Sequence, residues 1–325
     1  MIQFNPSALA VLLSLFLSSA VADDAKLSSN LVGCDEVSCP KKGAYDRCTV
    51  GNNTFMGIGL SHIADAPSSL DGFALVKGVN VSAGLGGKDN DKPTRPFKSF
   101  YYLGAPSDVE AKDLSGCVVV FHDPPSKMFK GPKLEGKDNG TDIRAASGTC
   151  SDVIDKKCIK KITDRATKLG DENGGDVCER LDREFKKNAP DECDGFAGNG
   201  RSFGRFSVQS LNNLTSIPNS TDCWPVKPKS DQLLGIVGRT TLRNYSGNAL
   251  VDEAYKITPI LTVFVGKDNS SLVKETSSQL TCLKVVTKEN PDDDEDSDKN
   301  SALMMKGSGF AGGIAVLVAA IFTFL

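Results

Sequence analysis

The sequence predicts a mainly β protein: an antiparallel, sandwich-like ectodomain with an inserted, disulfide-stapled helical hairpin, α+β overall. Short runs with strand-like patterning recur along most of the chain. The gaps between these runs are too short for regular βαβ crossovers, so neighbouring strands are expected to pair antiparallel. Helical spacing is confined to residues 149–190, which interrupt the strand pattern.

Eight runs are predicted to be strands. In the run 73–81, apolar residues alternate on one face, with Lys77 as the exception. Residues 117–121 are continuously apolar, which predicts a strand buried on both faces. Residues 84–96 are expected to be a polar, glycine-rich connection. The eight runs are 55–60, 73–81, 97–103, 117–121, 203–211, 233–242, 257–265 and 280–286.

The helical hairpin is predicted from two amphipathic stretches. Residues 149–169 carry apolar side chains at helical spacing, and Thr149 and Asp152 stand at capping-box spacing. Two consecutive glycines end this helix, and residues 176–187 form the second one.

The hairpin also predicts a disulfide pattern. We expect Cys158 to meet Cys178 and Cys150 to meet Cys193, as a nested pair of links across the two antiparallel helices. The physical reason is that short helices with thin apolar stripes need a covalent staple.

Ten cysteines in an exported chain predict a disulfide framework. The sequence alone leaves the rest of the connectivity open, although a cysteine-rich segment at residues 31–48 is expected to be stapled to the main domain. A zinc site is disfavoured because the chain has two histidines and no Cys-x2-Cys spacing, and we expect no metal and no cofactor. The candidates are Cys34, Cys39, Cys48, Cys117, Cys150, Cys158, Cys178, Cys193, Cys223 and Cys282.

The first 22 residues have the pattern of an export signal. They contain no charged side chain, and residues 8–17 form an apolar core of signal-peptide length. Residues 20–22 (Ala-Val-Ala) fit the small-x-small rule for cleavage. We therefore expect a signal peptide at residues 1–22 and a mature chain that begins near Asp23.

The C-terminal end has the pattern of a lipid-attachment signal. Residues 310–325 are apolar, but the run is shorter than the ~20 residues that a spanning helix needs, and no basic residue follows it. The small residues Asn300, Ser301 and Ala302 precede it by a short spacer and suit the attachment positions of a GPI signal. We expect residues 301–325 to be removed and the lipid to be joined to Asn300; a single-pass tail anchor is the alternative.

The charge of the expected mature protein gives no support for nucleic-acid binding. The net charge of the chain is -3, and removal of Lys306 with the tail changes it to -4. Six acidic residues lie within residues 292–298, part of a predicted acidic stalk at residues 291–300. The ectodomain at residues 23–290 is close to neutral and lacks the basic excess that phosphate binding requires.

Seven Asn-x-Ser/Thr sequons are spread along the chain. Each one that is used must lie on the surface, because the attached glycan is bulky and hydrated. Their number in an exported chain favours real use. The candidate N-glycosylation sites are Asn52, Asn80, Asn139, Asn213, Asn219, Asn244 and Asn269.

One motif of hydrolases occurs, but in the wrong context. Residues 200–204 match G-x-S-x-G, the nucleophile elbow of α/β-hydrolases. An elbow needs a strand before the serine and a helix after it, whereas here a loop precedes Ser202 and a strand-like run follows. His62 and His122 both precede Ser202, although that fold places its histidine last. We expect both histidines to be hydrogen-bonded or exposed.

No acidic cluster selects a catalytic pair. A glycosidase needs two carboxylates at a defined separation, and most of the available acids are expected to be loop and surface charges. We therefore expect no catalytic residue from sequence. The acids available for such a pair are Asp65, Asp71, Asp108, Glu110, Asp113 and Asp123.

The aromatic residues give few candidates for a glycan-binding platform. Trp224 is the only tryptophan and follows Cys223, so we expect it to pack against a disulfide rather than to bind sugar. Tyr101 and Tyr102 are weaker candidates for a platform.

The export signal, the sequons and the attachment site occur together with Cys34, Cys39-Pro40, Cys48 and the run 55–61 (FMGIGLS). In this combination the chain resembles the GPI-anchored surface glycoproteins predicted in ascomycete fungi. The resemblance implies a position at the extracellular face of the plasma membrane, in the cell wall, or in both. It is specific for location and not for activity, because such proteins include wall enzymes, adhesins and members of unknown role.

The sequence thus favours a non-enzymatic surface glycoprotein with a structural role or a role in binding glycans or partner cells. The expected partners are the membrane, through a GPI lipid, and cell-wall polysaccharides or other surface proteins. The alternative is a cell-wall hydrolase whose paired carboxylates converge only in three dimensions.

Overall fold

The computed structural model describes residues 48–123 and 148–287, both with gaps, together with Ile143, Arg144 and scattered positions of residues 31–46. No helix among these residues is long and apolar enough to cross a membrane. The predicted signal peptide, acidic stalk and C-terminal tail lie outside the described residues, as do Asn139, Asn219, Asn269, Asn300, Cys39 and Cys223.

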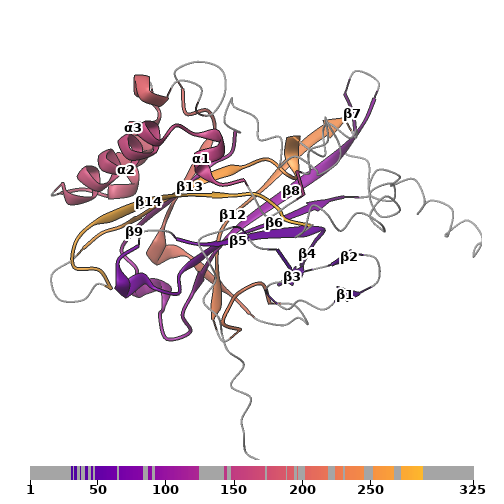
Figure 1. The fold of residues 1–325 in the computed structure, drawn as a ribbon, viewed down its shortest axis with the longest axis horizontal. Helices are drawn as coiled ribbons and strands as arrows, with labels where there is room; N and C mark the ends of the chain where they lie inside the picture. Colours follow the sequence, from indigo (N-terminus) through magenta and orange to yellow (C-terminus); the bar gives the residue numbers. More distant parts are fainter. Residues whose placement is uncertain are drawn as a thin grey trace, which may run out of the picture.

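The described chain is mainly β, and its two large sheets are antiparallel, as predicted (Figure 1). The larger sheet has six strands, in the order β11-β12-β8-β6-β5, with β7 paired to β8. Its strands are β5 (Gly57–His62), β6 (Ala74–Val81), β7 (Gly87–Asp89), β8 (Lys92–Ala105), β11 (Thr215–Ile217) and β12 (Gln232–Asn244).

The smaller sheet has four strands in the order β10-β9-β13-β14. Its strands are β9 (Gly116–Phe121), β10 (Phe206–Ser210), β13 (Thr258–Phe264) and β14 (Ser277–Leu283). The described residues also include two small hairpins and four short 3-10 helices. These are β1 (Lys41–Lys42), β2 (Tyr45–Asp46), β3 (Cys48–Val50), β4 (Asn53–Phe55), η2 (Ser68–Leu70), η3 (Ala111–Asp113), η4 (Asp191–Cys193) and η5 (Leu211–Asn213).

The two sheets pack face to face around one apolar core. Leu75 of the larger sheet lies in the same buried cluster as Val118 and Ile260 of the smaller sheet. Near the end of this core the rings of Phe73 and Phe264 meet edge to face, with centroids 5.9 Å apart. This is the predicted sandwich-like arrangement.

Strand β9 is buried along its whole length, because both of its faces are covered. Val118 and Val120 face the six-stranded sheet, whereas Cys117, Val119 and Phe121 belong to a second apolar cluster under the helices. The predicted burial of this strand on both faces is confirmed.

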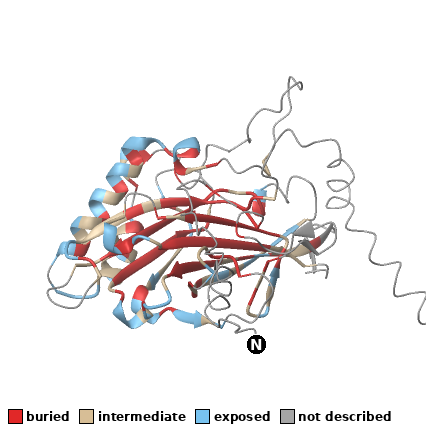
Figure 2. Ribbon diagram, turned by 60° about the horizontal axis from the view of Figure 1, so that its bottom comes forward, coloured by how far each residue is buried: buried red, intermediate tan, exposed pale blue. Residues whose placement is uncertain are grey.

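The helical insertion joins the adjacent strands β9 and β10 and covers the outer face of the four-stranded sheet (Figure 1). Figure 2 shows the sheet side of the helices buried and their outer side exposed. Gly174 (φ 87°) and Gly175 (φ 73°) adopt left-handed conformations in the loop between the two longer helices, where the sequence predicted a break. The helices are α1 (Cys150–Val153), α2 (Lys156–Asp171) and α3 (Val177–Phe185).

The first predicted helix is in fact two helices. Thr149 and Asp152 form the predicted capping box, but it begins only the short α1. The backbone is extended at Ile154, and a second cap follows, because the Asp155 side chain accepts a hydrogen bond from the Lys157 amide (2.9 Å). α2 therefore starts at its own N-cap.

Glycines in β5 allow the C-terminal end of the described chain to cross this edge of the sheet. Ile58 and Val286 form an antiparallel bridge between the strand and the segment after β14. A Cβ atom at Gly59 would lie 1.7 Å from the Lys284 carbonyl oxygen, so only glycine fits there. A Cβ atom at Gly57 would lie 2.5 Å from Val285 Cγ1 and 2.6 Å from Thr287 Cγ2.

The region predicted as a loop at residues 84–96 contains a hairpin instead. β7 pairs with the start of β8, with Gly87 opposite Thr94. β12 also pairs with β8 as far as Thr94, so backbone pairing continues through the polar sequence. The polar, glycine-rich composition of this region indicated a turn. Composition does not show the backbone hydrogen bonds between strands, and these bonds stabilise the hairpin.

The nested disulfide pattern predicted for the hairpin is wrong. Cys158 pairs with Cys193 and Cys178 pairs with Cys117 of β9. Cys178 lies in the first turn of α3, beside the connecting loop, whereas Cys158 lies at the far end of α2, ~18 Å away along the helix axis. The start of the first helix of an antiparallel pair meets the chain that follows the second helix, which is where Cys193 lies.

The remaining two described links also differ from expectation. Cys150 pairs with Cys282 of β14 rather than with a cysteine of the hairpin. Cys34 pairs with Cys48, so these two close the N-terminal segment on itself instead of joining it to the main domain.

The separation of the paired cysteines predicts how much each link stabilises the fold. Cys150–Cys282 spans 132 residues and Cys34–Cys48 spans 14. On the loop-entropy account, replacing both cysteines of a pair by serine should lower the free energy of unfolding by roughly 5 kcal/mol for the long link and roughly 3 kcal/mol for the short one. Urea denaturation of the two double variants measures this, and an equal loss in both would contradict the entropic account.

Peptide mapping under non-reducing conditions tests the links of the hairpin. We expect one linked peptide pair that contains Cys117 and Cys178 and another that contains Cys158 and Cys193. A peptide pair that joins Cys158 to Cys178 would restore the nested pattern and overturn the arrangement described above.

Candidate functional site

At one end of the sandwich the space between the two sheets is polar. Lys77, the exception in the alternation of β6, is fully buried there. Its Nζ donates hydrogen bonds to the Lys256 backbone oxygen (2.8 Å) and to Thr258 Oγ1 (3.2 Å). The Thr258 hydroxyl also lies 3.3 Å from the Tyr101 hydroxyl on β8. We call this group the interlayer polar cluster; its members are Lys77, Tyr101, His122, Ser207, Glu253, Lys256 and Thr258.

The environment of Lys77 favours a neutral amine. Burial lowers the pKa of Lys77 well below its usual value, and the charges of Lys256 and Lys284 lower it further, while Glu253 opposes them. A neutral amine has two N–H groups, and the two hydrogen bonds that Lys77 donates match that number. Lys77 therefore ties the two sheets together through two hydrogen bonds, in surroundings that disfavour its charge.

Glu253 is the carboxylate of the cluster and is held by two cations. Its oxygens lie 2.7 Å from Arg243 Nε and 2.9 Å from Lys256 Nζ. Burial raises the pKa of Glu253, but Lys256 and Arg243 outweigh burial and hold the pKa below its usual value. Lys256 also donates to the backbone oxygen of His122 (3.1 Å), which joins the carboxylate to the end of β9.

His122 lies just beyond β9 and is almost fully buried. Its Nε2 is 2.7 Å from the Ser207 hydroxyl of the neighbouring strand β10. Burial and then the charges of Arg239 and Lys256 lower the pKa of His122 to about 4. The imidazole is therefore neutral at neutral pH.

Asp123 and Arg205 form an ion pair beside His122. Arg205 donates two hydrogen bonds to Asp123 Oδ1, from Nη2 at 2.7 Å and from Nε at 3.0 Å, and its amide donates to Oδ2 (2.7 Å). Burial raises the pKa of Asp123, but Arg205 lowers it below its usual value. This carboxylate is engaged by arginine and does not contact the imidazole.

A neutral histidine next to a serine resembles two members of a catalytic triad. The third member is lacking: His122 Nδ1 is buried and has no hydrogen-bond partner among the described residues. Without a group that orients the imidazole, Ser207 is not set up as an activated nucleophile. The interlayer polar cluster acts as a hydrogen-bonded brace between the sheets.

The structure places the other predicted candidates apart from this cluster. Ser202 is exposed, and a strand rather than a helix follows it, so the nucleophile elbow is excluded. His62 Nδ1 lies 3.1 Å from the Phe73 backbone oxygen. Both histidines are therefore hydrogen-bonded, as predicted.

The carboxylates considered for a glycosidase do not form a buried pair in the described part of the chain. Asp71 and Asp108 are exposed. Glu110 and Asp113 are exposed and form the two sides of the capping box of η3. Asp65 lies outside the described residues.

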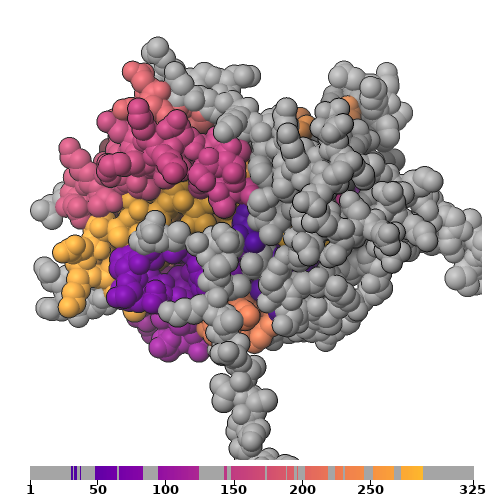
Figure 3. All heavy atoms as spheres, in the orientation of Figure 1, coloured from indigo at the N-terminus to yellow at the C-terminus, as the bar shows by residue number. Residues whose placement is uncertain are grey.

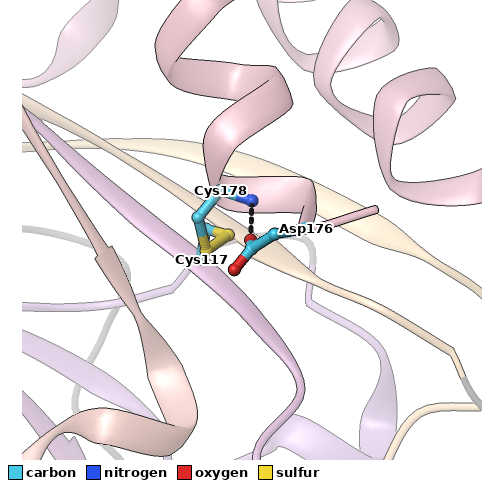
Figure 4. A group of neighbouring side chains, drawn as sticks. All are labelled: Cys117, Asp176 and Cys178. Carbon is cyan, nitrogen blue, oxygen red and sulfur yellow. Dashed lines mark hydrogen bonds between the residues drawn. A yellow bond between two sulfur atoms is a disulfide. The ribbon is translucent and has the colours of Figure 1, made fainter. Parts of the chain in front are cut away.

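One group has the composition of a metal site but is explained by other bonds. Cys117, Asp176 and Cys178 lie together, with their ligand atoms within 4.8 Å of one another. Figure 4 shows that the two sulfurs form a disulfide and that Asp176 points to the Cys178 amide, which donates to it at 2.6 Å. Metal binding requires thiolates, so the oxidised pair offers no ligand.

The aromatic candidates for glycan binding are buried. Trp224 was expected to pack against a disulfide, and it lies in the buried cluster that contains the Cys34–Cys48 disulfide; its Nε1 donates to the Asp231 backbone oxygen (2.7 Å). Tyr101 and Tyr102 are also buried, so the suggestion that they form a platform is wrong. Tyr101 packs in the core between the two sheets, and Tyr102 packs in the cluster that contains Trp224. Their position in a strand did not show that both side chains are buried.

Four of the seven predicted glycosylation sites are described. Asn52 and Asn213 are exposed, in the β3–β4 turn and in η5. Asn80 and Asn244 are half-buried at ends of β6 and β12. The first two present the more accessible side chains for a glycan.

Comparison of the chain with protein-family models, with curated proteins and with solved structures finds no match.

Sequence reasoning missed most of the interlayer polar cluster. Lys77 was visible as an exception to the β6 alternation, and Lys284 interrupts the apolar run 280–286 in the same way. Glu253 and Lys256 lie in a short turn segment without periodicity, so no pattern marked them as partners of a buried lysine.

Replacing Lys77 should change how stability depends on pH. The folded-state pKa is below the unfolded value of 10.5, so the unfolded chain binds the proton first as pH falls through 10.5. The wild type should therefore gain free energy of unfolding relative to Lys77→Met as pH rises toward 10.5. Urea denaturation at several pH values measures the difference, with Lys98→Met at an exposed position of β8 as the control. Parallel profiles for wild type and Lys77→Met would refute a neutral buried amine.

Protonation of His122 should destabilise the fold in acid. The folded pKa of about 4 lies below the unfolded value of 6.5, so the wild type should lose up to about 3 kcal/mol of unfolding free energy as pH falls from about 7 to about 4. His122→Gln should lack this loss, because it has no titrating ring. His62→Gln controls for the removal of a histidine elsewhere in the fold; a wild-type slope in His122→Gln would contradict the assignment.

Proposed function

We propose that this chain is a GPI-anchored extracellular glycoprotein of the fungal cell surface or wall. Its role is non-enzymatic: it contributes to the surface structurally or by binding glycans or partner proteins. The lipid-attachment signal that begins at Asn300 and the export signal at residues 1–22 are the sequence features on which the location rests.

The observation that carries this proposal is the set of four disulfides among the described residues. Such bonds persist in oxidising compartments outside the cytosol. Cys117–Cys178 and Cys150–Cys282 join segments 61 and 132 residues apart, so they hold the sandwich and the helical insertion together. A fold that depends on these links fits a secreted protein.

The surface of the described residues supports a binding role through polar contacts rather than stacking. Leu242 is the one large apolar side chain that is well exposed among them, at 53%. Trp224, Tyr101 and Tyr102 are buried. The exposed sequons at Asn52 and Asn213 add hydrated glycans to the same surface.

A cell-wall hydrolase has less support. It would need two carboxylates held at a fixed separation on an open site. Asp71 and Asp108 are exposed, and the buried Glu253 is engaged by two cations. The histidine–serine pair of the interlayer polar cluster lacks an orienting group among the described residues.

Enzymatic release from the membrane tests the anchor. Treatment of intact cells or membranes with phosphatidylinositol-specific phospholipase should move the protein into the soluble fraction, because the only link to the bilayer would be the lipid on Asn300. A variant that ends at residue 302 should be secreted without treatment. Mass-spectrometric detection of residues 303–325 in the mature protein would contradict the proposal.

A second assay separates binding from hydrolysis. The purified protein is incubated with wall glucan, chitin and mannan, and both retention and released sugars are measured. Retention without release is expected for a binding protein. Released sugar that disappears on replacing a single carboxylate would establish the hydrolase instead.

A further inference from the structure

Helix α2 carries far more positive than negative charge, in a chain whose net charge is -3. Asp164 and Asp171 are its only acidic residues. All six of its basic residues are exposed. These are Lys156, Lys157, Lys160, Lys161, Arg165 and Lys168.

Neighbouring acids neutralise only two of these six charges closely. Lys160 pairs with Asp164 at 2.7 Å, and Arg165 pairs with Glu184 of α3. Lys161 lies 3.9 Å from Glu192, at the limit of an ion pair. The other three lysines form no ion pair with a described residue. We define the basic face of α2 as Lys157, Lys161 and Lys168; Lys156 is exposed beside it, about 100° around the helix axis from Lys157.

The helix turns this face away from the protein. The opposite stripe, with Cys158, Ile162 and Ala166, is buried against the sheet. Lys157, Lys161 and Lys168 follow one another at helical spacing and extend over ~16 Å of the axis. Figure 2 shows the outer side of the helices exposed, and Figure 3 shows them forming a continuous part of the surface.

Two of the lysines are placed where they weaken the helix. Lys156 and Lys157 are the first two residues of α2, at the positive end of its macrodipole, where acidic residues are favoured. Asp155 caps the helix through the Lys157 amide and offsets part of this repulsion. Lysines at a helix start are unfavourable, and these two form no ion pair with a described residue that would compensate. Such unfavourable placements are typical of functional surfaces.

The basic face is also held rigidly. The Cys158–Cys193 disulfide fixes the start of α2 to the chain after α3. Ser278 of β14 bonds to the hydroxyl of Thr167 (2.7 Å) and to the backbone oxygen of Thr163 (2.6 Å). A surface ordered in advance loses little entropy on binding a charged polymer.

From these observations we infer that the basic face of α2 binds an anionic polysaccharide. The lysines present a row of point charges on an exposed helix, which suits a chain of repeated acidic groups rather than a single small anion in a pocket. No exposed aromatic ring accompanies them among the described residues, so the contact is ionic rather than stacked. This inference rests on the proposed extracellular location and names the class of glycan.

The test compares two variants with the same change in charge. Lys157→Glu/Lys168→Glu reverses two charges of the basic face, and Lys98→Glu/Lys274→Glu reverses two exposed charges elsewhere. The full chain is purified in detergent, and its binding to immobilised dextran sulfate, polygalacturonate and neutral dextran is measured. Sulfate and carboxylate probes distinguish the two sources of negative charge.

We expect the wild type to bind the anionic polymers but not neutral dextran, with affinity that falls as salt is raised. The affinity of the basic-face variant should be about tenfold lower than that of the wild type, or lower still. The affinity of the control variant should stay much closer to the wild-type value. Thermal unfolding should show little net change in stability in the basic-face variant, because glutamate at position 157 favours the start of α2 whereas glutamate at position 168 disfavours its last turn. Weak binding would then not be due to misfolding.

Three results would overturn the inference. The first is equal affinity of the two variants, and the second is tighter binding of duplex DNA than of dextran sulfate. The third is binding that appears only after the acids of residues 292–298 are replaced by amides, which would assign the basic face to the chain's own acidic stalk. Phospholipase release and retention on neutral wall glycans do not involve the basic face, so they report on the proposed function separately.

Discussion

The rest of the structure depends on strand β9, which is buried on both faces. A strand of six buried residues needs an apolar cover on each side. The six-stranded sheet supplies one cover, through the core around Val118 and Val120. The helical insertion supplies the other, over Val119 and Phe121. Helices α2 and α3 are amphipathic, and most of the stability of such helices comes from packing their apolar face, so the strand and the helices stabilise each other. The disulfide from Cys117 to Cys178 fixes this contact covalently.

The space between the sheets shows how a sandwich tolerates a polar end. A lysine in a core is costly when it is charged and unpaired. Lys77 avoids that cost because its environment favours the neutral amine and because two acceptors lie at its Nζ. Glu253 stays charged nearby because Arg243 and Lys256 hold it. The cluster therefore stabilises one arrangement of the two sheets, and its polar atoms are largely used by internal bonds. This geometry favours a structural role for the interior.

The surface of α2 is the part of the described molecule whose charges are least explained by folding. Its buried stripe is accounted for by the core, and Lys160 and Arg165 by ion pairs. The lysines at its start oppose the helix dipole and have no partner in the described fold. The interior polar groups bond to one another and the candidate aromatic residues are buried. The exposed lysines of α2 are therefore the strongest candidate for a binding surface among the described residues. An ionic contact with a wall polymer agrees with the extracellular location proposed from the ends of the chain.

The sequence by itself determined the fold class, most strand positions, the helical insertion and the two-sided burial of residues 117–121. These follow from hydrophobic periodicity and capping chemistry, which act over a few residues and are visible locally. Only the tertiary structure decided which cysteines pair, because a disulfide depends on distances between elements far apart in the chain, as for Cys150 and Cys282. It likewise decided that Lys77 is buried and paired with the turn that carries Lys256, since the two lie in separate segments that meet only when the sheets pack.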